Sequence, residues 1–300
     1  MKKKTYLFAL MAMVLTLGSC SDNENGIGGE TSKYITVSTS IGNMTRVATD
    51  AKGGQTFEEG DEISVYAWTG DATVAPETRE RVVNNAINKL TNGSWISTPQ
   101  MLWKNNRDKH YFIGVYPISA ISDLSAGEYT FDVTKQTESD LLVAINKDGL
   151  SYNVDEQQPV PLTFTHVMAK LAVNLTYKNQ WGGIPTVEKV VVGNAAKEAT
   201  INYLTKVVTP STTAKEDFSL PEITENSKYV SVIIPQEEVT QLTIVIGGKN
   251  FVYDNGTPFK LESGKITTVN LEVGRDEIKL GDVKITNWED GSTFSGEALN

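Results

Sequence analysis

The chain has 300 residues, of which 27 are Lys or Arg and 37 are Asp or Glu, and it contains one cysteine and two histidines. This acidic balance disfavours nucleic acid as a partner, because binding to phosphates needs clustered positive charge. A single cysteine excludes an intramolecular disulfide, so the fold must be stabilised by the burial of apolar surface.

Residues 1–19 have the pattern of an export signal. Three lysines precede an apolar run over residues 6–17, which is too short to span a bilayer as a mature helix. Gly18 and Ser19 then precede Cys20, as in a lipobox, where the thiol is acylated and the peptide bond before it is cut. The pattern predicts a lipoprotein signal peptide and a lipid anchor on Cys20, with an ordinary signal peptide and an incidental cysteine as the alternative.

The segment 20–32 is rich in Asp, Asn, Glu and Gly, which predicts a flexible tether. Beyond it, alternation of apolar and polar residues predicts strands at 34–41, 63–68 and 111–116. Residues 77–90 fit a helix, but three asparagines leave strand or loop equally open there.

A second series of strands begins after Gln158. Residues 161–175 alternate throughout, which predicts one long strand. Further strands are predicted at 189–192, 199–203, 229–234, 242–246, 250–253 and 265–273. Short strands separated by Gly, Asn and Pro are typical of sandwiches, so we expect an all-β chain with two β-sandwich domains, 33–158 and 159–300.

Residues for catalysis are few. His110 stands in a charged segment and is expected to be a solvated turn residue. His166 has the parity of Leu162, Phe164 and Met168, which predicts a packed histidine on an apolar face. The sequence has none of the motifs of serine hydrolases, zinc hydrolases or nucleotide enzymes, so we expect no enzyme and no cofactor.

Carboxylates and tryptophans offer two further possibilities. The acidic run 58–62 matches no calcium loop and predicts a tight turn at Gly60, and 146–149 predicts a hairpin turn, so we expect no metal site. Four tryptophans are candidates for a sugar-binding platform, with packing over the sheets as the default. They are Trp95, Trp103, Trp181 and Trp288.

Several stretches, in this order and spacing, resemble the fimbrillin-like family of lipoprotein precursors of pilus subunits and related surface proteins. They are residues 45–48, 56–67, 111–117, 162–171, 264–265 and 285–291. The resemblance implies two transthyretin-like sandwiches in a non-enzymatic fimbrial subunit, exposed on the cell outer membrane. It also implies that a protease cuts after Arg46, so that Val47 becomes the new N-terminus.

Loss of strand 34–41 would leave a groove and an unpaired sheet edge, which a strand of another fimbrial subunit can fill. The segment 279–300 is the candidate donor strand, although its polar end also fits a tip subunit or a lipoprotein outside the pilus. Arg46 as a plain loop cation remains the alternative to cleavage. The alternative function is a lipid-anchored carbohydrate-binding protein with a host or glycan ligand.

Overall fold

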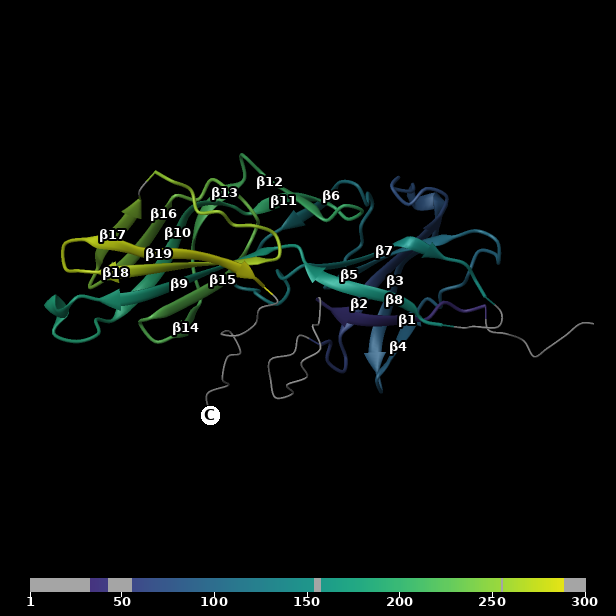
Figure 1. Cartoon of the computed structure of the whole chain (residues 1–300), viewed down its shortest axis with the longest axis horizontal. Helices are drawn as coiled ribbons and strands as arrows, with labels where there is room; N and C mark the ends of the chain where they lie inside the picture. Colours follow the sequence, from purple (N-terminus) through teal and green to yellow (C-terminus); the bar gives the residue numbers. More distant parts are fainter. Residues whose placement is uncertain (1–32, 43–55, 154–157, 255, 289–300) are drawn as a thin grey trace, which may run out of the picture. The chain divides into compact units, whose positions relative to one another are not determined.

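The computed structural model describes residues 33–42, 56–153, 158–254 and 256–288 (Figure 1). In these ranges the chain forms nineteen β-strands and two single-turn 3-10 helices, η1 (Thr78–Glu80) and η2 (Asn179–Trp181). The expected all-β fold class is therefore confirmed. Within the same ranges, no helix has the length and apolar character needed to cross a membrane.

The first part of the chain forms a seven-stranded sheet in the order β1-β8-β7-β5-β2-β3-β4. β1 pairs with β8 in parallel, and the other neighbours pair antiparallel. β1 and β4 are therefore its two edges. Its strands are β1 (Val37–Ile41), β2 (Glu62–Thr69), β3 (Arg81–Thr91), β4 (Ser94–Thr98), β5 (His110–Tyr116), β7 (Leu142–Leu150) and β8 (Val160–His166).

The central strands of this sheet are buried on both faces. In β2, Val65 and Ala67 belong to one apolar cluster, whereas Tyr66 and Trp68 belong to another. Successive side chains of a strand point to opposite faces, so each face of the sheet covers its own core. This explains why β2 is an almost continuous apolar run.

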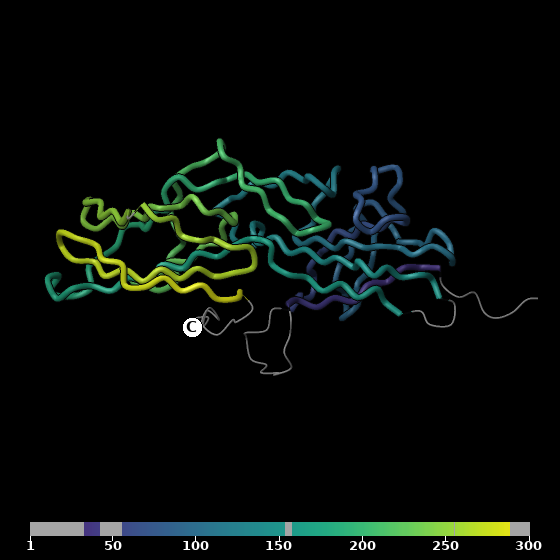
Figure 2. Tube along the Cα trace, turned by 45° about the horizontal axis from the view of Figure 1, so that its top comes forward, coloured from purple at the N-terminus to yellow at the C-terminus, as the bar shows by residue number. Residues whose placement is uncertain are grey.

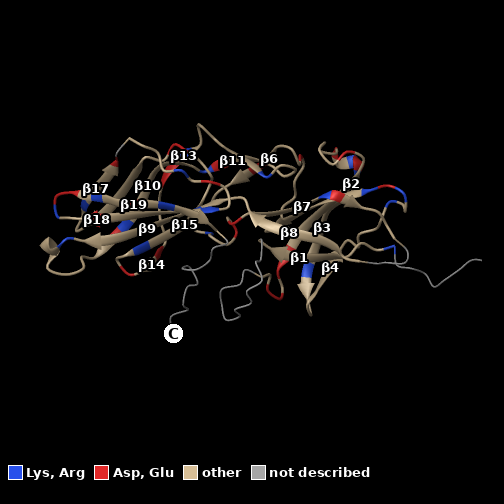
Figure 3. Ribbon diagram, in the orientation of Figure 1, with Lys and Arg blue, Asp and Glu red and all other residues tan. Residues whose placement is uncertain are grey.

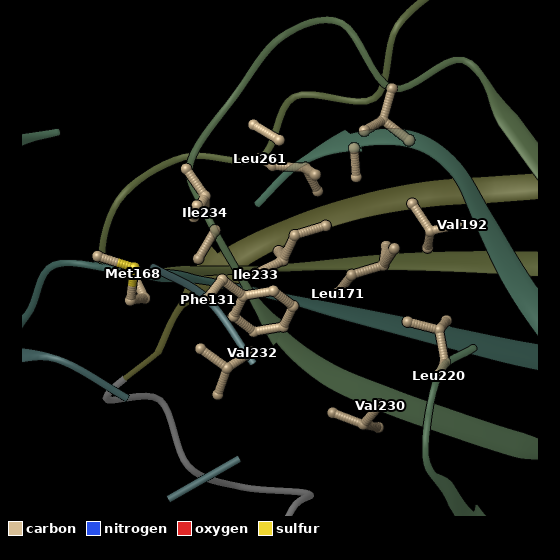
Figure 4. Packing of buried hydrophobic residues seen from close by; sticks show 14 of the residues in the cluster. Phe131, Met168, Leu171, Val192, Leu220, Val230, Val232, Ile233, Ile234 and Leu261 are labelled. Atoms are coloured by element: carbon tan, nitrogen blue, oxygen red, sulfur yellow. The ribbon is translucent and has the colours of Figure 1, made fainter. Parts of the chain in front are cut away.

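The second part of the chain forms a five-stranded sheet, β14-β15-β9-β18-β19, and a four-stranded sheet, β13-β10-β16-β17. Leu171 of β9, Val232 of β15 and Val192 of β10 belong to one core (Figure 4). These strands are β9 (Ala169–Tyr177), β10 (Val187–Ala196), β13 (Lys215–Ser219), β14 (Glu222–Thr224), β15 (Lys228–Ile233), β16 (Gln241–Ile246), β17 (Lys249–Asp254), β18 (Lys265–Val273) and β19 (Ile278–Asn287).

A small three-stranded sheet contains strands from both parts of the chain. β6 (Gly127–Thr130) pairs with β11 (Glu198–Asn202), which also pairs with β12 (Val207–Pro210). Lys and Arg positions are interspersed with Asp and Glu positions along the ribbon of the described elements (Figure 3).

The single long strand expected at 161–175 is wrong, because the chain forms two strands there. β8 pairs with β1 and β7 in the first sheet, and β9 pairs with β15 and β18 in the second. Val167 and Met168, which separate them, are both buried. The residues between β8 and β9 are apolar and include neither Gly nor Pro, so no local feature of the sequence marks the end of one strand and the start of the next. The domain boundary at Gln158 remains a prediction, and β8, which follows it, belongs to the first sheet.

Two local expectations have different outcomes. Residues 77–90, for which helix, strand and loop were open, form η1 and then β3. The hairpin turn expected at 146–149 is wrong, because these residues lie within β7. Gly149 does have a positive φ of 68°, and its N–H donates to the side-chain oxygen of Asn146 at 3.1 Å. The Asp-Gly pair therefore makes an irregularity inside a strand and does not reverse the chain.

Candidate functional site

Residues 33–42, called here the N-terminal strap, are bound along the first sheet (Figure 2). The Ile35 N–H donates to the Met101 carbonyl at 2.9 Å, and the Trp103 N–H donates to the Lys33 carbonyl at 3.1 Å. The chain then continues as β1, whose strand neighbour in the sheet is β8. One edge of β1 therefore makes no ladder within the described sheet.

The strap has one apolar face. Ile35 and Val37 are buried, Thr39 and Ile41 are half-buried, and the residues between them are exposed. Alternation with a period of two places these four side chains in one inward row. The row covers a cluster that includes Val65, Phe112 and Phe164, each 0% exposed.

An aromatic group lies at the end of β1. Phe57 contacts Trp95, Tyr116 and Phe164 edge-on, with ring centroids 5.3, 5.4 and 5.1 Å away. The indole N–H of Trp95 donates to Thr39 Oγ1 at 3.0 Å. Thr39, the polar member of the inward row, is thereby bonded to the strand at the other edge of the sheet.

A cavity of about 740 Å³ adjoins this contact. Its lining includes residues 36–41 of the strap, residues 94–96 of β4, and Phe57 and Leu90. It therefore lies between the two edge strands of the sheet.

The last described strand, β19, is an edge strand with a partly covered apolar row. Leu280 and Val283 lie opposite Leu271 and Val269 of β18, with a bulge between the two pairs. Opposite residues share a face, so both side chains point toward the core side. Leu280, Val283 and Ile285 are nevertheless 36%, 41% and 38% exposed. The described part of the candidate donor segment, 279–288, is thus folded onto its own sheet.

Trp288, which follows β19, is enclosed by charged and titratable groups. Its ring stacks on His166 at a centroid distance of 4.1 Å, and Lys170 Nζ lies 4.2 Å from the ring centroid. His166 Nδ1 bonds to Asp140 Oδ1 at 2.7 Å. Burial lowers the pKa of Lys170, and the negative charge of Asp140 acts in the opposite direction. The cluster joins the end of β19, the last described strand, to β8 and β9.

The packed position expected for His166 is confirmed. Its side chain is 5% exposed and lies against Trp288. A histidine bonded to a carboxylate is also a feature of general bases, but a substrate would have to displace the indole to reach this imidazole. The geometry is that of a core contact.

The solvated position expected for His110 is wrong. The residue is 0% exposed, and the Lys104 N–H donates to its Nε2 at 3.1 Å while Nδ1 lies 3.0 Å from the Asp108 carbonyl. Nε2 must accept and Nδ1 must donate, which only the neutral imidazole can do. Burial lowers the pKa of His110, although Asp108 favours the charged form. The charged residues before it in sequence form a loop that turns back over the ring.

Stability is expected to depend on pH through His110. The unfolded chain takes up a proton near pH 6.5, whereas the folded chain does so only at lower pH. The contribution of neutral His110 is therefore complete above about pH 6.5 and is lost as the pH falls, by at most about 1.4 kcal/mol per pH unit. Urea unfolding between pH 7.5 and pH 5 measures this loss. The variant His110→Asn should show a shallower pH dependence, and equal slopes in the two proteins would contradict the assignment.

The four tryptophans considered for a sugar platform are used in packing. Trp288 is 1% exposed, and the other three are half-buried. Trp103 contacts His110 edge-on at 5.0 Å, and the Trp181 indole donates to the Val273 carbonyl at 2.9 Å. Trp95 and Trp103 pack on one apolar cluster and Trp181 on the other. The default expectation of packing is confirmed.

The acidic run 58–62 forms the expected tight turn. Gly60 has a φ of 98°, and Asp61 Oδ2 accepts the Glu58 N–H at 2.7 Å. Glu59 accepts the backbone N–H of Asn92, in the turn between β3 and β4, at 2.6 Å. These carboxylates bind backbone donors. Across the described residues, no three His, Cys, Asp or Glu side chains are grouped in a way that suits a metal ion.

The remaining predicted site residues, Cys20, Arg46 and Val47, lie outside the described residues, as does the end of the chain after Trp288. Sequence reasoning missed two contacts, that of Trp95 with Thr39 and that of Trp288 with His166. The parity of Thr39 with Ile35 and Val37 indicates its inward direction. No local pattern identifies its tryptophan, which is 56 residues away.

Known proteins resemble the chain in sequence and in fold. The family model described as "Fimbrillin-like" matches residues 45–288. A protein of Bacteroides uniformis named "Putative fimbrium subunit Fim1C" is 26% identical over 318 residues, with 97% of each chain covered.

Two crystal structures described as "putative cell adhesion protein" have the same fold. One, from Bacteroides ovatus, has a TM-score of 0.65 at 18% identity and covers 85% of this chain and 98% of its own. The other, from Bacteroides uniformis, has a TM-score of 0.63 at 20% identity and covers 86% and 100%. The family match includes most of the described strands and ends at Trp288. The chain belongs to the fimbrillin-like family.

Proposed function

We propose that the chain is a structural or adhesive subunit of a surface fimbria. It is exported as a lipoprotein through Cys20, released by cleavage after Arg46, and joined to another subunit by strand exchange. The observation that carries the proposal is the N-terminal strap, because this edge segment covers an apolar cluster and is followed in sequence by Arg46.

The contacts of the strap suit a segment that is later replaced. Ile35 and Val37 are buried in the apolar cluster. Within the described sheet, however, β1 forms hydrogen bonds to only one neighbouring strand, β8. Loss of the strap would remove the ladder neighbours of Leu162 and Phe164 and leave the edge of β8 unpaired. Both an apolar groove and an open edge favour the addition of another strand.

The order of the segments along the chain supports the same scheme. Cys20 precedes the strap, and Arg46 stands four residues after Gly42, the last described residue of the strap. One cut after Arg46 would separate the lipid anchor and the strap from the rest of the chain. The candidate donor segment 279–300 includes β19, whose apolar row is partly exposed.

Replacement of Arg46 by alanine is expected to abolish assembly. Protein recovered from the cell surface should begin at Val47 in the wild type and carry no lipid, whereas the variant should retain acylated Cys20. Intact mass, N-terminal sequencing and the yield of sheared fimbriae measure the two effects. Arg79→Ala is the matched control, because the Arg79 side chain is 79% exposed and lies in η1.

Wild-type protein that retains acylated Cys20 and residues 21–46 at the surface would contradict cleavage. The anchored form would then be the mature one, and assembly by strand exchange would have to be abandoned. A cleaved subunit that forms no fimbriae would contradict the assembly step alone.

A further inference from the structure

The inward row of the strap has an unusual member at its third position. Ile35, Val37 and Ile41 are aliphatic, whereas Thr39 is a hydroxyl residue that shares their direction. The hydroxyl of Thr39 accepts a hydrogen bond from the Trp95 indole at 3.0 Å. A valine has the same shape as threonine but has no oxygen to accept this bond.

Trp95 is held in place independently of the strap. It lies in β4, which pairs with β3, and its ring contacts Phe57 edge-on. Phe57 in turn contacts Phe164 of β8. None of these contacts involves β1, so they do not depend on which strand takes its place.

We propose that Trp95 selects the strand that replaces the strap. The partner is an extended segment of another subunit with aliphatic side chains at the first, second and fourth inward positions. Its third inward position holds a short side chain with an acceptor oxygen, such as Thr or Ser. This inference rests on the proposed function, since it specifies which strand the vacated groove accepts.

The physical basis is the cost of an unmade hydrogen bond. An aliphatic side chain in the third position leaves the half-buried indole N–H without its acceptor, and a hydrogen bond of this kind changes affinity by about fivefold. The neighbouring cavity of about 740 Å³ lies beside Trp95 and β1, so a slightly larger residue in the third position is not excluded by space alone. Trp95 therefore distinguishes a hydroxyl side chain from an aliphatic one by the hydrogen bond and not by size.

The test uses the full chain with a specific protease site inserted within residues 43–55, so that cleavage separates the strap from the rest of the protein. A labelled peptide with the sequence of residues 33–42 is then exchanged into the groove, and its affinity is measured by fluorescence anisotropy. The second peptide carries Thr39→Val. The third carries Thr36→Val, the same change at an exposed position of the strap.

We expect the Thr39→Val peptide to bind about fivefold more weakly than the parent peptide. The Thr36→Val peptide should bind like the parent. On a Trp95→Phe protein, which has no indole donor, the difference between the parent and Thr39→Val peptides should disappear.

Equal binding of the parent and Thr39→Val peptides to the wild-type groove would overturn selection by Trp95 and leave the proposed function intact. Persistence of the difference on the Trp95→Phe protein would also overturn it. If no peptide enters the cleaved protein, strand exchange itself fails, and the proposed function fails with it.

Discussion

Replacement of Trp288 by alanine is expected to lower the free energy of unfolding by about 3–5 kcal/mol. The indole is 1% exposed and contacts both the His166 ring and the Lys170 ammonium. Alanine would leave a cavity at this point and remove both contacts. Urea unfolding monitored by circular dichroism measures the loss, and hydrogen exchange in β18 and β19 should rise with it.

The control for this prediction lies on the same strand. Ile285 is 38% exposed in β19, so Ile285→Ala should cost only about 1.5 kcal/mol, since three partly buried carbons are removed. A Trp288→Ala protein no less stable than Ile285→Ala would show that the cluster does not fasten the end of the strand.

Replacement of Val37 by aspartate is expected to release the strap from its groove. Val37 is 6% exposed in the apolar cluster, and an uncompensated charge at such a position costs about 3–5 kcal/mol. The Val160 N–H, which donates to the Thr36 carbonyl at 2.8 Å, reports on the docked strap. Hydrogen exchange at Val160 should accelerate by more than about 100-fold, since each 1.4 kcal/mol is a factor of ten.

Ser38→Asp is the matched control for this change. Ser38 is the next residue of β1 and is exposed, so the same charge there should change stability by less than about 0.5 kcal/mol. If Val37→Asp leaves the exchange rate of the Val160 amide unchanged, the strap is not held by its inward row.

Strand patterns in the sequence predicted about half of the described strands and missed β4, β6, β7, β12, β13 and β14. Strands were expected at 63–68 and 111–116, and β2 and β5 occupy these positions. Alternation failed between β8 and β9, because Val167 and Met168 are apolar on both sides of a change of sheet. The charged residues around His110 predicted a solvated side chain, but this was wrong because backbone groups of Lys104 and Asp108 bond to the buried ring.

By itself, the sequence determined the all-β class, the inward direction of His166 and the membership of the fimbrillin-like family. These depend on the residue pattern along the chain, because alternation shows which face of a strand is apolar. Only the tertiary structure decided that the strap covers Phe164, that Trp95 meets Thr39, and that Trp288 lies on His166. Each of these contacts joins residues far apart in the sequence. Their energies depend on which strands become neighbours, and no local pattern specifies that.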